Sequence, residues 1–206
     1  AASAEPHALV RAVERIAPSV VGVYCGDGEW PAATADDPGA VQRRRGLGSG
    51  VVVSPNGLVI TNTHLLAGGS PRVRTTDGRT LPAKFVASDG PTNLALLAVE
   101  LPAGTTLAAA PCVADDDLVL AETMLAVGNP LGRAPLVSAG VISAIREREG
   151  GRIQADANLG NQNGGGAIVD ANGRLLGIAD AGAIDPIDMA YAMRGDRVTT
   201  ETNLST

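Results

Sequence analysis

Aromatic side chains are almost absent from this chain, whose 206 residues include one Trp, two Tyr and one Phe. Apolar residues still make up 45%, so a sizeable core has to be built from Val, Leu, Ile and Ala, and the branched types favour strands. No run of about 20 apolar residues occurs, which excludes a membrane-spanning helix. The 26 Gly and 13 Pro supply many turns, and the composition predicts one globular domain rich in β-structure.

Positive charge is also scarce, because 16 Lys and Arg stand against 22 Asp and Glu, a formal net charge of −6. Nucleic-acid binding normally needs a basic surface, so we do not expect a nucleic-acid partner. The one basic cluster is Arg43-Arg44-Arg45. A solvated loop edge is the favoured interpretation, and a docking patch or a cleavable loop is the alternative.

Cysteine and histidine occur twice each. Cys25 and Cys112 permit one disulfide or two buried thiols, and the sequence leaves both alternatives open. His7 lies near the start of the chain and His64 far from it, and carboxylates such as Asp156 or Asp180 have no ligand spacing. We therefore expect no metal or other cofactor, and metal binding is the weakest functional alternative.

Four motifs follow one another along the chain. The first, Gly48–His64 (GSGVVVSPNGLVITNTH), has two apolar strands flanking a Pro-Asn-Gly turn, with a histidine where the second strand ends. The others are Ser88–Val99 (SDGPTNLALLAV), Leu125–Gly132 (LAVGNPLG) followed by Ser138–Ser143 (SAGVIS), and Asp156–Val169 (DANLGNQNGGGAIV).

In order and spacing, these motifs resemble the protease domain of the HtrA/Deg family of trypsin-like serine proteases. The family patterns are a GSG hairpin ending in TNNHV, then TDLAVL, AIGNP with SGIVS, and GNSGGPLV. The resemblance runs from about Leu9 to Val198. It is specific because the four motifs occur together, whereas one alone would be weak.

The resemblance implies a degenerate catalytic triad. His64 stands at the position of the general base, Asn93 at that of the aspartate, and Gly164 at that of the serine nucleophile. Glycine has no side chain to attack a carbonyl. An amide cannot stabilise an imidazolium by charge, and replacing the triad aspartate of a serine protease by asparagine lowers turnover by about 10⁴. Gln162 replaces the glycine of the oxyanion hole, so with Asn163 that loop is expected to be altered.

An inactive triad has three alternatives. A one-residue shift would make Asn163 the replaced position, which restores no nucleophile. Ser138 or Ser143 could substitute, but both are expected in a strand before the nucleophile loop. A single engineered change is commonly enough to inactivate a protease, and three altered positions together indicate inheritance.

The resemblance predicts an all-β fold of two six-stranded antiparallel barrels with a short N-terminal helix, in one domain over residues 1–206. Barrel one is expected at about residues 17–100 and barrel two at about 117–198, with a mobile loop at about 26–46. The apolar period of Glu5–Ile16 predicts the helix. Trp30, in the loop, is either a contact point or packed onto the barrel.

Barrel two is expected to contain six strands: Leu118–Val127, Leu136–Ile145, Ile153–Ala155, Ala167–Val169 and Leu175–Ala181 as a hairpin, and Met189–Met193. Arg194 replaces the proline of the family's last motif. From the resemblance, the peptide or ligand cleft is expected at Ile178, Ala179, Asp180 and Tyr191.

We therefore predict an inactive homologue that binds a peptide, a protein partner or a ligand, as a scaffold or regulator. A residual or altered endopeptidase that relies on His64 is the alternative. The start Ala1–Ala4 and the family favour an exported, extracytoplasmic protein. The residues up to Thr206 are too few for the PDZ domain of many relatives, which is absent, trimmed or lost. The oligomeric state is open, although trimers are common in the family.

Overall fold

The computed structural model describes residues 8–27, 29–30, 46–112, 118–146, 152–157, 164–180 and 190–194, and the structural statements below concern these residues. The chain enters through helix α1 (Ala8–Ile16) and the 3-10 turn η1 (Ala17–Ser19). Ala12 and Ile16 are buried on one face of α1, the face expected from the apolar period. Pro18 lies in η1, where the chain turns into the first strand.

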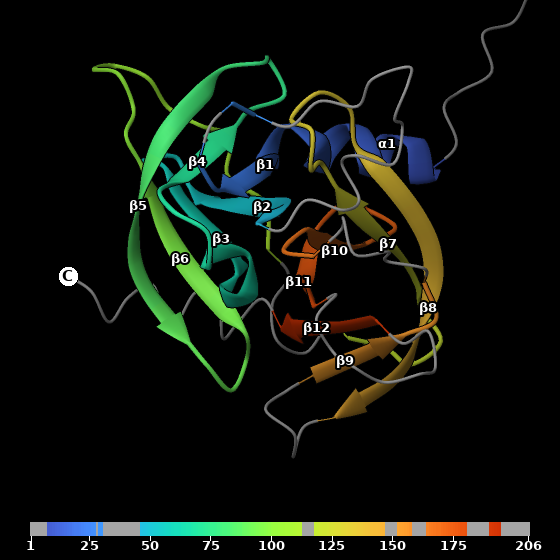
Figure 1. Ribbon diagram of the computed structural model, residues 1–206. Helices are drawn as coiled ribbons and strands as arrows, with labels where there is room; N and C mark the ends of the chain where they lie inside the picture. Colours follow the sequence, from blue (N-terminus) through green and yellow to red (C-terminus); the bar gives the residue numbers. More distant parts are fainter. Residues whose placement is uncertain are drawn as a thin grey trace, which may run out of the picture.

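Barrel one closes in the strand order β1-β2-β3-β6-β5-β4 (Figure 1). Its strands are β1 Val20–Cys25, β2 Leu47–Ser54, β3 Leu58–Asn62, β4 Pro71–Arg74, β5 Thr80–Asp89 and β6 Leu94–Val99. The turn between β2 and β3 is closed by a hydrogen bond from the Gly57 amide to the Ser54 carbonyl, 3.0 Å. Gly57 has φ +93°, a backbone conformation that glycine adopts without steric cost.

Barrel two closes in the strand order β10-β11-β12-β9-β8-β7. Its strands are β7 Thr123–Gly128, β8 Leu136–Arg146, β9 Arg152–Ala155, β10 Ala167–Asp170, β11 Leu175–Asp180 and β12 Ala190–Arg194. All its pairings are antiparallel, as in barrel one. Two six-stranded antiparallel barrels with one short helix confirm the predicted fold class.

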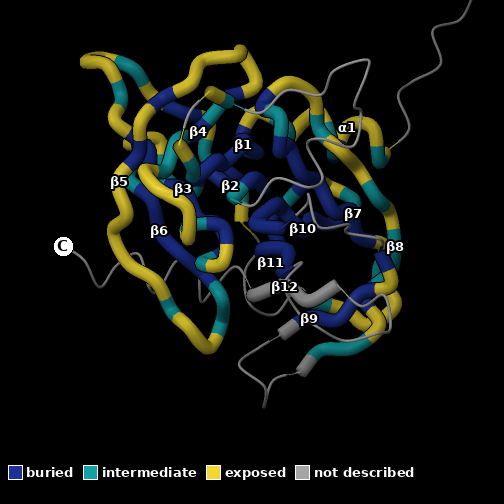
Figure 2. Tube along the Cα trace, in the orientation of Figure 1, coloured by how far each residue is buried: buried dark blue, intermediate teal, exposed yellow. Residues whose placement is uncertain are grey.

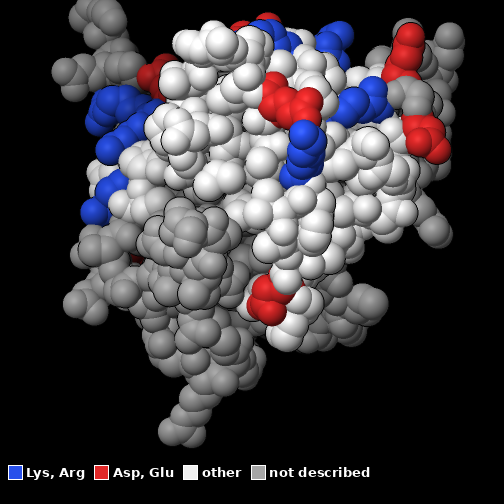
Figure 3. All heavy atoms as spheres, turned by 90° about the vertical axis from the view of Figure 1, so that its left-hand side faces the viewer, with Lys and Arg blue, Asp and Glu red and all other residues white. Residues whose placement is uncertain are grey.

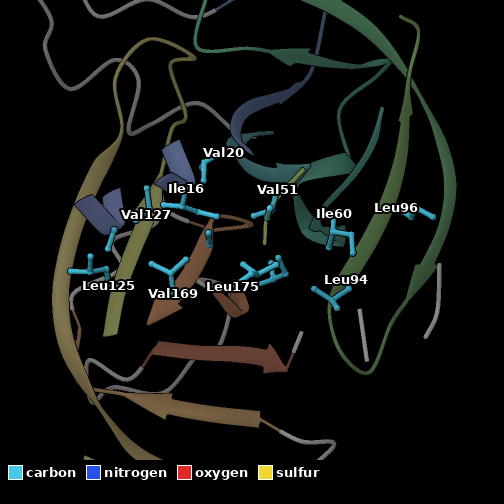
Figure 4. Packing of buried hydrophobic residues seen from close by; sticks show 14 residues of the cluster. Ile16, Val20, Val51, Ile60, Leu94, Leu96, Leu125, Val127, Val169 and Leu175 are labelled. Atoms are coloured by element: carbon cyan, nitrogen blue, oxygen red, sulfur yellow. The ribbon is translucent and has the colours of Figure 1, made fainter. Parts of the chain in front are cut away.

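The barrels share a core. Side chains from β2, β3 and β6 of barrel one meet side chains from β7, β10 and β11 of barrel two, and α1 packs against the same cluster (Figure 4). The labelled members of this cluster include Val51, Ile60, Leu125 and Leu175. Each barrel also has its own aliphatic interior, so buried residues follow the strands on both sides of the molecule (Figure 2). The scarcity of aromatic residues is met by close packing of branched side chains, as expected.

Two local expectations were wrong. The strand expected over Leu118–Val127 begins only at Thr123, because Ala121 has φ +66°, which interrupts an extended strand. The second strand of the first hairpin ends at Asn62, and His64 lies in the 3-10 turn that follows it. The sequence left open whether Cys25 and Cys112 pair, and in the structure both are free thiols, Cys25 buried and Cys112 exposed.

Trp30 packs onto barrel one, one of the two alternatives left open by the sequence. Its ring lies 5.9 Å from that of Tyr24, centroid to centroid, in an edge-to-face arrangement. The Arg74 guanidinium lies 5.7 Å from the Trp30 centroid. A Cβ on Gly22 would come within 2.8 Å of the indole, so this glycine makes room for the ring. The Arg43–Arg45 cluster lies outside the described residues.

The outer side of barrel one carries charges of both signs. On the face turned to the viewer in Figure 3, acidic and basic side chains of the described residues are interspersed among uncharged ones. One such pair is Lys84 with Glu100, 2.8 Å apart and largely exposed, where an ion pair contributes little to stability. In the described part of the chain, no helix is long and apolar enough to cross a membrane.

Asp170 holds the hairpin between β10 and β11. Its carboxylate accepts hydrogen bonds from the Asn172 amide, the Arg174 amide and the Arg174 guanidinium, at 2.7–2.9 Å, and its side chain is 1% exposed. Burial alone would raise the pKa of Asp170, but the hydrogen bonds from Arg174 and Asn172 and the charge of Arg174 outweigh it. The pKa therefore lies below its ordinary value.

We expect Asp170→Asn to lower the free energy of unfolding by about 1–3 kcal/mol at pH 7. A depressed folded-state pKa stabilises the fold above the unfolded-state pKa, about 3.9, and this contribution is lost as pH falls towards the folded-state value. The gap between the native chain and Asp170→Asn should therefore close below about pH 4. Urea unfolding of both proteins from pH 7 downwards measures it, and a gap independent of pH would contradict the assignment.

Candidate functional site

His64 is carried by the 3-10 turn η2 (Thr63–Leu66), directly after β3. Two hydrogen bonds fasten this turn to the start of β6. The Thr63 amide donates to the Asn93 carbonyl at 2.9 Å, and the Thr63 hydroxyl donates to the Leu94 carbonyl at 2.8 Å. The histidine, which is exposed, therefore has a fixed backbone position next to the turn between β5 and β6.

Asn93 ends that turn and has φ +56°, a left-handed conformation that Asn adopts more readily than most residues. Its side chain meets His64 twice. The Asn93 Oδ1 accepts a hydrogen bond from the His64 amide at 3.2 Å, and the Asn93 Nδ2 lies 2.9 Å from the His64 Nδ1. The predicted neighbours in the triad pattern are thus in contact.

A third residue completes this group from the other barrel. Asp180, at the end of β11 and 8% exposed, accepts a hydrogen bond from the Asn93 Nδ2 at 2.8 Å. Sequence reasoning placed Asp180 in the cleft but missed this contact, because 87 residues separate the partners. An acidic residue ending a strand of the second half was the available signal.

Gly164 and Gly165 form a turn before β10 that is fastened to both barrels. The Ser49 amide of β2 donates to the Gly164 carbonyl, and the Gly165 amide donates to the Ala179 carbonyl of β11, both at 2.9 Å. A Cβ on Gly48 would meet the Leu65 side chain at 2.4 Å and the Gly164 carbonyl at 3.0 Å. Gly164 and the turn that carries His64 therefore both lie close to Gly48.

The two alternative nucleophiles lie on β8, Ser138 opposite Ala126 of β7 and Ser143 further along. In Figure 1, β8 runs along the right-hand edge, whereas η2 follows β3 on the left of the molecule. This separation does not favour a reaction of either hydroxyl with His64.

Ile178 and Ala179, which the resemblance placed at the cleft, have buried side chains. Ile178 belongs to the core shared by the barrels and Ala179 to the interior of barrel two. Both backbone groups of Ala179 are bonded to the turn at Gly165 and Gly166, so this residue cannot pair with an added strand. Within barrel two, β11 pairs with β10 on one side and with β12 on the other.

Other expected site residues lie partly or wholly outside the description. Gln162 and Asn163, in the expected oxyanion loop, are outside the described residues, and so is His7. Tyr191 is described by its backbone alone, which pairs with Asp180 on one side and Gln154 on the other. Within the described ranges, no three His, Cys, Asp or Glu side chains gather in a way that could hold a metal ion.

Comparison with known proteins decides the family. Residues 48–178 match the family model of the trypsin-like peptidase domain. The chain belongs to the trypsin-like peptidases. Its relatives among characterised sequences include the periplasmic serine endoprotease DegP of Salmonella typhimurium, 36% identical over 152 residues, and the putative serine protease HhoA of Synechocystis, 34% identical over 175 residues. These relatives confirm the HtrA/Deg resemblance.

Solved structures agree with this assignment. The serine endoprotease from Yersinia pestis superposes with a TM-score of 0.79 at 29% sequence identity, covering 98% of this chain and 67% of the other. The match to DegP covers 69% of this chain but 31% of DegP, and the match to HhoA covers 76% of this chain and 44% of HhoA. This HtrA-like chain therefore corresponds to less than half the length of these two relatives.

Proposed function

We propose that this HtrA-like chain is catalytically inactive and acts by binding a peptide or protein partner at the site around His64. The observation that supports the proposal most directly is Gly164. The turn it belongs to lies next to the segment carrying His64, as a nucleophile turn would, but glycine offers no oxygen to attack a carbonyl.

The neighbours of His64 support the same proposal. A general base in a serine protease needs a carboxylate against its Nδ1, which orients the ring and stabilises the imidazolium. Here Nδ1 faces the Asn93 amide nitrogen at 2.9 Å, which carries no negative charge. The fold around these positions is nevertheless complete, with closed barrels and a shared core. The catalytic groups are thus lost, while the fold that would hold a peptide is kept.

The binding role rests on the relatives. Proteins named as serine proteases must hold a polypeptide substrate, and a homologue without chemistry can keep that capacity. DegP is named as periplasmic, and this likeness supports the proposal that this chain is extracytoplasmic as well. The second candidate is a residual hydrolase relying on His64, and the many relatives named as proteases favour it.

Hydrolysis of casein and labelling by a fluorophosphonate separate the two candidates. We expect the native chain to show neither above the level of the His64→Ala variant, because that variant removes the one triad member retained. Turnover by the native chain that His64→Ala abolishes would overturn inactivity and support the residual hydrolase. Binding of fluorescein-labelled unfolded casein, followed by anisotropy, tests the other half of the proposal, which fails if the native chain does not bind.

A further inference from the structure

We infer that Asp180 is a positioning residue, which locks the Asn93 amide so that His64 carries its proton on Nε2 and acts as a hydrogen-bond donor. The inference deepens the proposed function, on which it rests for the identity of the ligand. A donor at this position suits an acceptor oxygen, such as a carbonyl or carboxylate of a bound peptide. The relatives' triad asks the same ring for the opposite behaviour, a base that accepts a proton at Nε2.

The orientation of the Asn93 amide is fixed from two sides. Its oxygen faces the His64 amide N–H at 3.2 Å, and its nitrogen faces the Asp180 carboxylate at 2.8 Å. If the amide were flipped, its NH₂ would face an N–H donor and its oxygen would face a carboxylate. Both contacts would become repulsive, so the orientation follows from the partners and not from a choice between two similar atoms.

The tautomer of His64 follows from this orientation. The Asn93 nitrogen carries two hydrogens, of which one is donated to Asp180 and the other points to the His64 Nδ1 at 2.9 Å. A nitrogen that receives an N–H must offer a lone pair, so Nδ1 is unprotonated. In a neutral imidazole the proton then resides on Nε2.

Asp180 is needed for this lock because of its charge and its burial. An ionised carboxylate can accept hydrogen bonds but cannot donate them. Because Asp180 is only 8% exposed, its carboxylate requires donors from the protein. An amide at position 180 could present either its oxygen or its nitrogen to Asn93, so it would not dictate the orientation. Asn93 and Asp180 therefore form a matched pair, in which the acid lies one residue further from the imidazole than in the relatives' triad.

Nitrogen NMR of the imidazole rings tests the inference directly. We would record two-bond ¹H–¹⁵N spectra of uniformly labelled native chain, His7→Gln (which assigns the two histidines), Asp180→Asn and a control, Glu100→Gln. Glu100 is a surface carboxylate paired with Lys84, so its removal changes charge without touching the site. All spectra are taken where the imidazole is neutral.

The native chain and Glu100→Gln are expected to show His64 with an unprotonated Nδ1 and a protonated Nε2, and Asp180→Asn a mixture of the two tautomers. A native His64 protonated on Nδ1 overturns the inference, and this spectrum needs no variant to fold. An unchanged, single tautomer in folded Asp180→Asn also overturns the positioning role. Added casein peptide is expected to shift Nε2. If the tautomer results hold and Nε2 does not move, the inference stands and the proposed peptide binding fails.

Discussion

Gly164→Ser with the exchange Asn93→Asp/Asp180→Asn is expected to hydrolyse casein about 10⁴-fold faster than Gly164→Ser alone. Serine restores a nucleophile, but a base locked as a donor cannot take its proton. The exchange places the carboxylate against the His64 Nδ1 and an amide behind it. Because one acid and one amide trade places, composition and net charge at these two positions are unchanged.

The variant without the change at position 180 is the informative control. With Asn93→Asp alone, two carboxylates would face each other at a position where Asn93 and Asp180 now lie 2.8 Å apart. Like charges at that distance cannot both ionise freely, and one acid holds a proton. We therefore expect Gly164→Ser/Asn93→Asp to remain well below the variant that also carries Asp180→Asn.

Rates of casein hydrolysis and of fluorophosphonate labelling measure this series, with all members built on Gln162→Gly to restore the glycine of the oxyanion loop. Adding His64→Ala to the fastest variant should return it to background. Equal rates with and without Asp180→Asn would contradict the charge argument. Activity in the native chain would instead show that the nucleophile lies elsewhere.

Much of the fold could be predicted from the sequence because local signals and the motif order agreed. The Pro-Asn-Gly turn lies between β2 and β3, with Gly57 at a positive φ, and the Asp170–Gly173 turn joins β10 to β11. The contact of His64 with Asn93 was implied by the resemblance. These features depend either on a few adjacent residues or on a pattern shared with the relatives.

The rest depends on tertiary geometry. The late start of β7 follows from the positive φ of Ala121, a conformation that alanine rarely adopts and that its sequence neighbours did not signal. The burial of Ile178 and Ala179 follows from closure of barrel two. The hydrogen bond between Asn93 and Asp180 joins the two barrels, and no local pattern encodes such a contact.

The largest loss of stability is expected from Gly165→Ala. Gly165 has φ +79°, and a Cβ there would lie 2.2 Å from the Ser49 carbonyl oxygen and 2.7 Å from the Thr61 hydroxyl. Neither neighbour can retreat easily, because the Thr61 hydroxyl donates to that carbonyl at 2.7 Å and both residues are buried. The Ser49 hydroxyl is also fixed, as it accepts the Asn129 amide at 2.8 Å.

Left-handed strain of about 1–2 kcal/mol and overpacking of about 1–3 kcal/mol together predict a loss of roughly 2–5 kcal/mol in the free energy of unfolding. Gly104→Ala is the matched control, since Gly104 has φ +75° and a Cβ there would meet nothing within 4 Å. It should cost only the strain, about 1–2 kcal/mol. Urea unfolding of both variants separates the terms. Equal losses would mean that the turn at Gly165 can shift to accommodate a Cβ without a cost in free energy. The tight contact between the barrels would then not explain why Gly164 lies beside the segment carrying His64.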